Sequence, residues 1–192
     1  MVKVGFIVEG DSEKVVVESA SFGKWLSENG FSLVAPVINA KGGGNLLPQN
    51  ISVFLQRLQQ AGAERVAVIT DLEREVSVND VRTRVDTAGI DAIFVAVKAL
   101  EAWFLADTDA MRRWLNVPDF FEPQPECTPD LPWQRLKDAA STNGSRGPGS
   151  KAAFAKRFTR HHGFDINRSA QHPECPSARE LVDYFSTAAT ED

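Results

Sequence analysis

Three short apolar runs, each followed by a stretch in which apolar residues recur at helical spacing, most strongly constrain the fold of this chain. The runs are rich in β-branched residues and cover residues 2–8, 65–70 and 92–97. Apolar runs of this length without polar alternation are typical of strands covered on both faces. Because strands and helices alternate, they predict a parallel sheet with helices on both sides. We therefore expect an α/β fold with a doubly wound, mostly parallel sheet.

The connecting segments fit this fold. Helical spacing of apolar residues predicts helices over 11–28, 48–61, 78–88 and 100–115. Gly30 and Gly62 supply stop signals after the first two of these segments. Residues 31–38 are predicted to form a further strand, and Pro36 within it indicates an edge position or a bulge.

The pattern changes after residue 115. Residues 118–132 are rich in proline and acid and predict an irregular linker. Short helices are predicted over 133–140 and 152–159, with a glycine-rich loop at 143–149 between them, and a last helix begins near residue 177. We expect an α/β domain over 1–115 and a mainly helical, loop-rich extension over 116–192 packed on it.

The net charge and the cysteine content indicate which cellular compartment and which binding partners are expected. The formal net charge of −5 argues against a protein that coats nucleic acid by bulk electrostatics, so any contact with nucleic acid must be local. No apolar run approaches the length of a membrane span, and the first residues lack a basic lead and a cleavage site. Cys127 and Cys175 lie far apart and suit reduced thiols. A cytoplasmic protein without membrane contact is expected.

Acidic residues directly follow two of the predicted strands. Glu9 follows the first run, and Asp71 and Glu73 follow the run at 65–70. Ligands of open α/β sheets bind at the carboxyl ends of the strands. If these two strands are neighbours, three carboxylates converge, which is costly without a cation and matches the oxygen ligands that magnesium prefers. The sequence therefore predicts a site for Mg²⁺ or Mn²⁺.

Other acids near the same strand ends have competing interpretations. Glu101 follows the predicted strand at 92–97. It is either a further metal ligand or an acid in the first turn of a helix, where the helix dipole favours negative charge. Asp11, Ser12 and Glu13 are predicted to cap the first helix.

Basic residues in the second half offer contacts for phosphates. Lys151, Lys156, Arg157 and Arg160 could hold a nucleic-acid backbone, or they could form a solvated helix face. Lys41, which precedes three glycines, could help to cradle a phosphate through exposed amides, although a plain turn is the simpler interpretation.

Two segments resemble the TOPRIM pattern shared by topoisomerases, primases and the nucleases associated with bacterial defence ATPases. They are residues 8–13 (VEGDSE) and 69–73 (ITDLE). The resemblance implies acid/base work for Glu9 and magnesium binding for Asp71 and Glu73. Glu73 departs from the pattern, in which an aspartate is more usual. The second half, with LEAWFLAD at 100–107, PGSK at 148–151 and CPS at 175–177, resembles a TOPRIM-like family of bacterial proteins.

The expected function is a magnesium-dependent nuclease that hydrolyses nucleic-acid phosphodiesters. The resemblance further implies a role in bacterial defence with a partner ATPase, which neither composition nor spacing indicates. Two alternatives stay open. One is a catalytically silent TOPRIM-like subunit that binds or regulates a partner. The other is a small-molecule phosphotransfer enzyme that uses the same acids.

Overall fold

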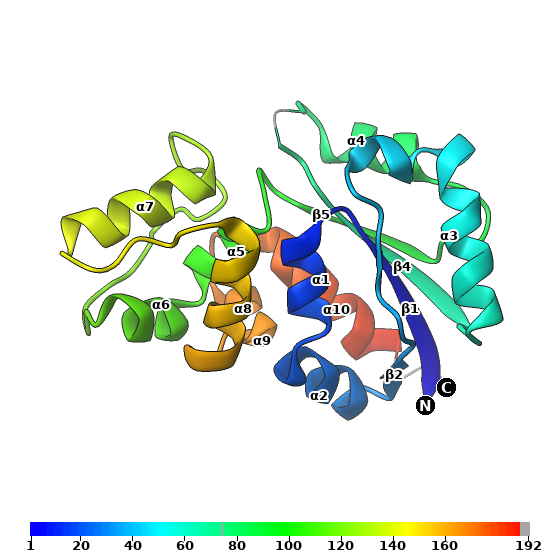
Figure 1. Ribbon diagram of the computed structural model, residues 1–192, viewed down its shortest axis with the longest axis horizontal. Helices are drawn as coiled ribbons and strands as arrows, with labels where there is room; N and C mark the ends of the chain where they lie inside the picture. Colours follow the sequence, from blue (N-terminus) through cyan, green and yellow to red (C-terminus); the bar gives the residue numbers. More distant parts are fainter. Residues whose placement is uncertain (74, 189–192) are drawn as a thin grey trace.

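The computed structural model describes residues 1–73 and 75–188, and its centre is a parallel sheet (Figure 1). The strands run in the order β2-β1-β4-β5, and β3 pairs with the end of β1 beyond β2. Their bounds are β1 Val2–Val8, β2 Phe31–Leu33, β3 Ile38–Asn39, β4 Arg65–Asp71 and β5 Ala92–Ala96. The pairings between the described strands are all parallel, which confirms the predicted α/β class.

Helices surround this sheet and form the second half of the chain (Figure 1). Their bounds are α1 Asp11–Val17, α2 Ala20–Glu28, α3 Pro48–Gln60, α4 Val78–Val85, α5 Glu101–Ala106, α6 Thr108–Leu115, α7 Pro132–Thr142, α8 Lys151–His161, α9 Ile166–Gln171 and α10 Pro176–Ala188, with a 3₁₀ turn η1 at Gly43–Leu46. Among the helices of the described part, none is long and apolar enough to cross a membrane.

Alternate side chains of the central strands enter two separate cores. Val4, Phe6 and Val8 of β1 belong to a cluster with α1, α2 and α10, whereas Ile7 belongs to a cluster with α3 and α4. This alternation is the period of two expected for a strand covered on both faces. The continuous apolar runs in the sequence therefore arise because both faces of the sheet are buried.

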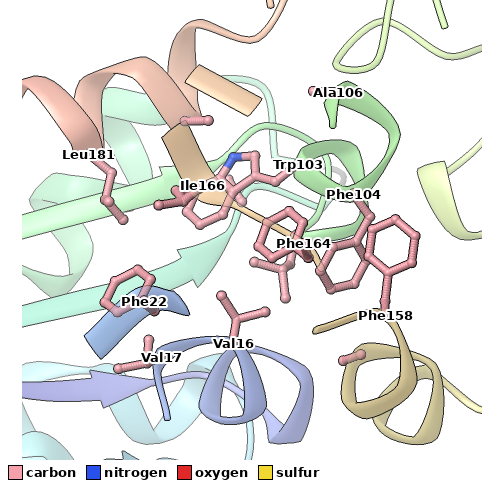
Figure 2. Close-up of a cluster of buried hydrophobic side chains, with 14 of the residues drawn as sticks. Val16, Val17, Phe22, Trp103, Phe104, Ala106, Phe158, Phe164, Ile166 and Leu181 are labelled. Atoms are coloured by element: carbon pink, nitrogen blue, oxygen red, sulfur yellow. The ribbon is translucent and has the colours of Figure 1, made fainter. Parts of the chain in front are cut away.

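The larger core continues into the helical extension. Figure 2 shows Val16 of α1 facing the same cluster as Trp103 and Phe104 of α5 and Phe158 of α8. The rings of Phe104 and Phe158 lie 5.2 Å apart. Residues from both sides of position 115 thus share this core, and the domain boundary expected at that position stays a prediction.

Three predicted elements are divided in the structure. The predicted strand 31–38 becomes β2 and β3, separated by a segment that contains Pro36, and β2 is an edge strand as expected. The predicted helix 11–28 breaks where the side chain of Ser19 accepts a hydrogen bond from the Phe22 amide and starts α2. The predicted helix 100–115 breaks at Asp107, whose carboxylate accepts from the Ala110 amide and starts α6.

Candidate active site

An acidic crevice opens at the carboxyl ends of β1 and β4. These strands are neighbours, with Val8 opposite Ile69, so Glu9 and Asp71 come out side by side. The crevice has a volume of about 460 Å³, and the carboxylates of Glu9, Glu13, Asp71 and Glu101 line it together with Lys151. The adjacency of strands on which the predicted site depends is confirmed.

Glu9 is held in a fixed position by three donors. One carboxylate oxygen accepts from the Gly43 amide at 3.1 Å, and the other accepts from the Thr70 hydroxyl at 2.5 Å and the Asp71 amide at 3.2 Å. Gly43 is also close packed against this carboxylate, since a Cβ built there would lie 3.2 Å from a Glu9 oxygen. The turn after β3 and the end of β4 therefore orient the Glu9 side chain.

Asp71 ends β4 and lies among other acids. Its Oδ1 accepts a hydrogen bond of 2.8 Å from the Leu100 amide, which links the strand end to the start of α5. Burial raises the pKa of Asp71 well above its usual range, and the charges of Glu13, Glu101 and Glu9 act in the same direction. The carboxylate of Asp71 is thus unstable as an anion unless a cation lies nearby.

Glu13 is the site residue that the sequence did not predict. The helix α1 has Gly10 at its N-cap, so Asp11, Ser12 and Glu13 lie in its first turn and not at the cap position. Only 6% of Glu13 is exposed, and burial, followed by the charges of Glu101 and Glu9, raises its pKa to about 7. The separation of four residues between Glu9 and Glu13 was the available signal, because one turn of helix after the strand returns the side chain to the strand end.

Glu101 and Lys151 face each other across the crevice. The Lys151 Nζ lies 3.2 Å from a carboxylate oxygen of Glu101, of which 2% is exposed. Burial alone would lower the pKa of Lys151, but the charge of Glu101 and the weaker charges of Asp71 and Glu13 raise it above its ordinary value. Glu101 thus belongs to the crevice as well as to the first turn of α5.

The donor set of the crevice is chemically suited to a hard divalent cation. All four acids offer oxygen, and a cation would relieve the repulsion that raises the pKa of Asp71 and Glu13. In the conformation of the described residues, no group of three or more His, Cys, Asp or Glu side chains is placed to hold a metal ion. Coordination by Asp71, Glu13 and Glu101 would therefore require side-chain rotation within the crevice.

Glu73 lies near Asp71 but does not line the crevice that Glu13 and Glu101 line. It lines an adjoining hollow of about 270 Å³, which it shares with Glu9 and Asp71 but not with Glu101. The backbone at Glu73 has φ +50, a left-handed conformation that turns the chain away from the direction of β4. Its amide donates to the Lys98 carbonyl at 2.7 Å, which ties this turn to the segment after β5.

Lys41 reaches the same crevice but is already paired. Its Nζ lies 2.8 Å from Asp11, and this hydrogen bond holds the pKa of Asp11 below its ordinary value. The glycine amides after it point inward, since Gly42 donates to the Glu9 carbonyl and Gly43 to the Glu9 side chain. The amides of Gly42 and Gly43, which were predicted as possible phosphate contacts, thus bind Glu9 instead.

The structure separates the four predicted phosphate contacts of α8. Lys151 lies in the crevice, whereas Lys156 and Arg160 line a different hollow of about 680 Å³. Arg157 donates to the Pro148 carbonyl at 3.2 Å, and its guanidinium lies 5.6 Å from the centre of the Phe154 ring. Arg157 therefore holds the loop before α8.

No family model matches this chain, and no curated protein matches it either. Among solved structures, the chain is similar to the C-terminal region of the Burkholderia pseudomallei OLD protein, with 17% sequence identity and a TM-score of 0.47. The likeness covers 98% of this chain and 99% of that one. A likeness at this level does not extend to an activity.

Proposed function

We propose that the acidic crevice is the active site of a metal-dependent phosphodiesterase that acts on nucleic acid. The observation that carries this proposal is the burial of Asp71 and Glu13 beside two further carboxylates, which raises the pKa of both acids. Such crowding is costly for folding, and it is typical of sites in which carboxylates serve a cation or a proton transfer. The neighbouring Lys151 adds a positive charge that could face a phosphate.

Each side chain has a role in this proposal. Asp71, Glu13 and Glu101 would hold Mg²⁺ or Mn²⁺, which supplies Lewis-acid polarisation of a phosphoryl oxygen. Glu9, fixed by its three donors, would accept the proton of the attacking water. Lys151 would turn from Glu101 toward the phosphate and stabilise the charge that develops on its oxygens.

A cleavage assay with a matched variant tests the proposal. Plasmid DNA, single-stranded DNA and RNA are incubated with the protein and Mg²⁺ or Mn²⁺. We expect wild type to cleave these substrates and a chelator of the metal to abolish the cleavage. The cleavage rate of Asp71→Asn should be lower by at least about 100-fold, because removal of a charge-stabilising group typically costs that much. Asp119→Asn, which changes an exposed acid outside the crevice, is the control and should cleave as wild type does. Cleavage that persists in Asp71→Asn would contradict the proposal.

A catalytically silent binding subunit is the second candidate. It is favoured by the absence, among the described residues, of acids already arranged for coordination, and by the position of Glu73 outside the crevice that Glu13 and Glu101 line. In that case wild type would bind nucleic acid or a partner without metal-dependent cleavage of any tested substrate.

A further inference from the structure

A second hollow lies at the far end of the helix pair that lines the acidic crevice. The helices α1 and α8 pack side by side (Figure 1). Their first residues, including Glu13 and Lys151, line the crevice, whereas later residues, including Val15 and Lys156, line the hollow of about 680 Å³. The two recesses are therefore placed along one pair of helices.

Two cations and one acid line the hollow, so it carries a net positive charge. Lys156 and Arg160 are exposed, and they are four residues apart, which places them on the same side of α8. Within the described ranges, neither side chain makes an ion pair or a side-chain hydrogen bond. Glu18, the acid that lines the hollow, lies 3.6 Å from the Lys14 Nζ. Two uncommitted cations thus share one recess in a chain whose net charge is −5.

Lys156 and Arg160 lie farther along α8 than Lys151 and are turned roughly 140–180° from it about the helix axis, so a strand that reaches both recesses must pass around α8. With a rise of 1.5 Å per residue, Lys156 lies about 7–8 Å and Arg160 about 13–14 Å beyond Lys151 along the helix axis. Ser19 and Ser21 also line the hollow, and the Ser21 hydroxyl donates a hydrogen bond of 3.0 Å to the Phe164 carbonyl. The cations, rather than these hydroxyls, are the groups available to a ligand.

We propose that this hollow is a second phosphate subsite, which holds the backbone of the nucleic-acid strand whose scissile phosphodiester lies in the crevice. This inference rests on the proposed function. It adds that the substrate is an extended nucleic-acid strand. Contacts from Lys and Arg to phosphates position a strand without reading its sequence. The preferred substrate is therefore a strand that extends several nucleotides beyond the cleaved bond, bound without base specificity.

The test compares two double variants that remove the same charge. Lys156→Ala/Arg160→Ala removes the hollow's cations, and Arg57→Ala/Lys137→Ala removes two exposed cations from α3 and α7. Affinity for a labelled thymidine dinucleotide and dodecanucleotide is measured by fluorescence anisotropy over a range of salt. We expect the first variant to bind the dodecanucleotide about fivefold or more weakly, with a salt slope smaller by about 0.7 for each lost phosphate contact. The dinucleotide should be bound equally by both variants.

Separate outcomes distinguish this inference from the proposed function. Dodecanucleotide binding that is equal in the two double variants overturns the subsite. Hydrolysis of bis(4-nitrophenyl) phosphate by wild type with Mn²⁺ tests the crevice alone, because this small diester does not reach the hollow. If the hydrolysis fails while the difference in binding persists, the subsite stands and the catalytic proposal falls.

Discussion

Glu13 links the protonation of the crevice to the stability of the fold. Its ordinary pKa of 4.5 rises to about 7 in the folded protein, so the folded state binds a proton that the unfolded chain has released between these values. A group of this kind contributes stability that is fully present below pH 4.5 and is lost as pH rises through about 7. The shift corresponds to roughly 3 kcal/mol of unfolding free energy.

We predict that Glu13→Gln removes this dependence, because glutamine resembles the protonated acid and does not titrate. Urea unfolding of both proteins in a chelating buffer, at a series of pH values, measures the effect. The stability of wild type relative to the variant should fall by up to about 3 kcal/mol between acidic and neutral pH. A difference that does not change with pH would show that Glu13 is not buried among charges.

The role of Glu13 could not be predicted from its neighbours in the sequence. An acid in the first turn of a helix is ordinarily a favourable partner for the helix dipole. What changes its role is first its burial and then the approach of Glu101, which lies far away along the chain and enters the crevice through α5. Glu9 and Asp71, in contrast, were predictable because an apolar run fixes the point at which a buried strand ends.

At the scale of elements, Asp107 holds three helices together. It is fully buried, starts α6 through the Ala110 amide, and accepts from the Asp165 amide at 2.9 Å before α9. The guanidinium of Arg168 in α9 donates to both of its oxygens at 2.8 Å. These contacts satisfy a carboxylate that would otherwise be costly to bury.

Replacing Asp107 should therefore destabilise the extension strongly. We predict that Asp107→Ala lowers the unfolding free energy by about 3 kcal/mol, because it leaves the amides and Arg168 without their shared acceptor. Asp109→Asn changes an exposed acid 4.0 Å from the same arginine and should cost less than about 1 kcal/mol. Denaturant unfolding of both variants measures the contrast, and equal losses would mean that the buried contacts add no stability.

The breaks between helices were harder to predict than the strands. The break at Asp107 depends on Asp165 and Arg168, which are distant in the sequence. The helix α9 was missed because it is only six residues long and carries Asn, Arg, Ser and Gln among its apolar positions. The strands are set by continuous apolar runs, and these are visible without knowledge of partners.

At the scale of the whole molecule, the crevice joins the sheet to the helical extension. Glu9 and Asp71 come from strand ends, Glu101 from α5, and Lys151 from α8. A hydrogen bond of 2.7 Å from the Trp103 indole to the Ser177 hydroxyl ties α5 to α10, and Ser177 in turn donates to the buried Glu126. The candidate site thus depends on contacts between segments that lie far apart in the sequence.

Titration of Mn²⁺ into the protein by isothermal calorimetry tests the central claim, that the crevice takes a divalent cation through Asp71. We predict saturable binding to wild type near neutral pH, with release of protons because Asp71 and Glu13 have raised pKa values. The cation should also raise the melting temperature through preferential binding to the folded state. Both effects should be absent in Asp71→Asn and retained in Asp119→Asn. Binding of equal strength in wild type and Asp71→Asn would contradict the account.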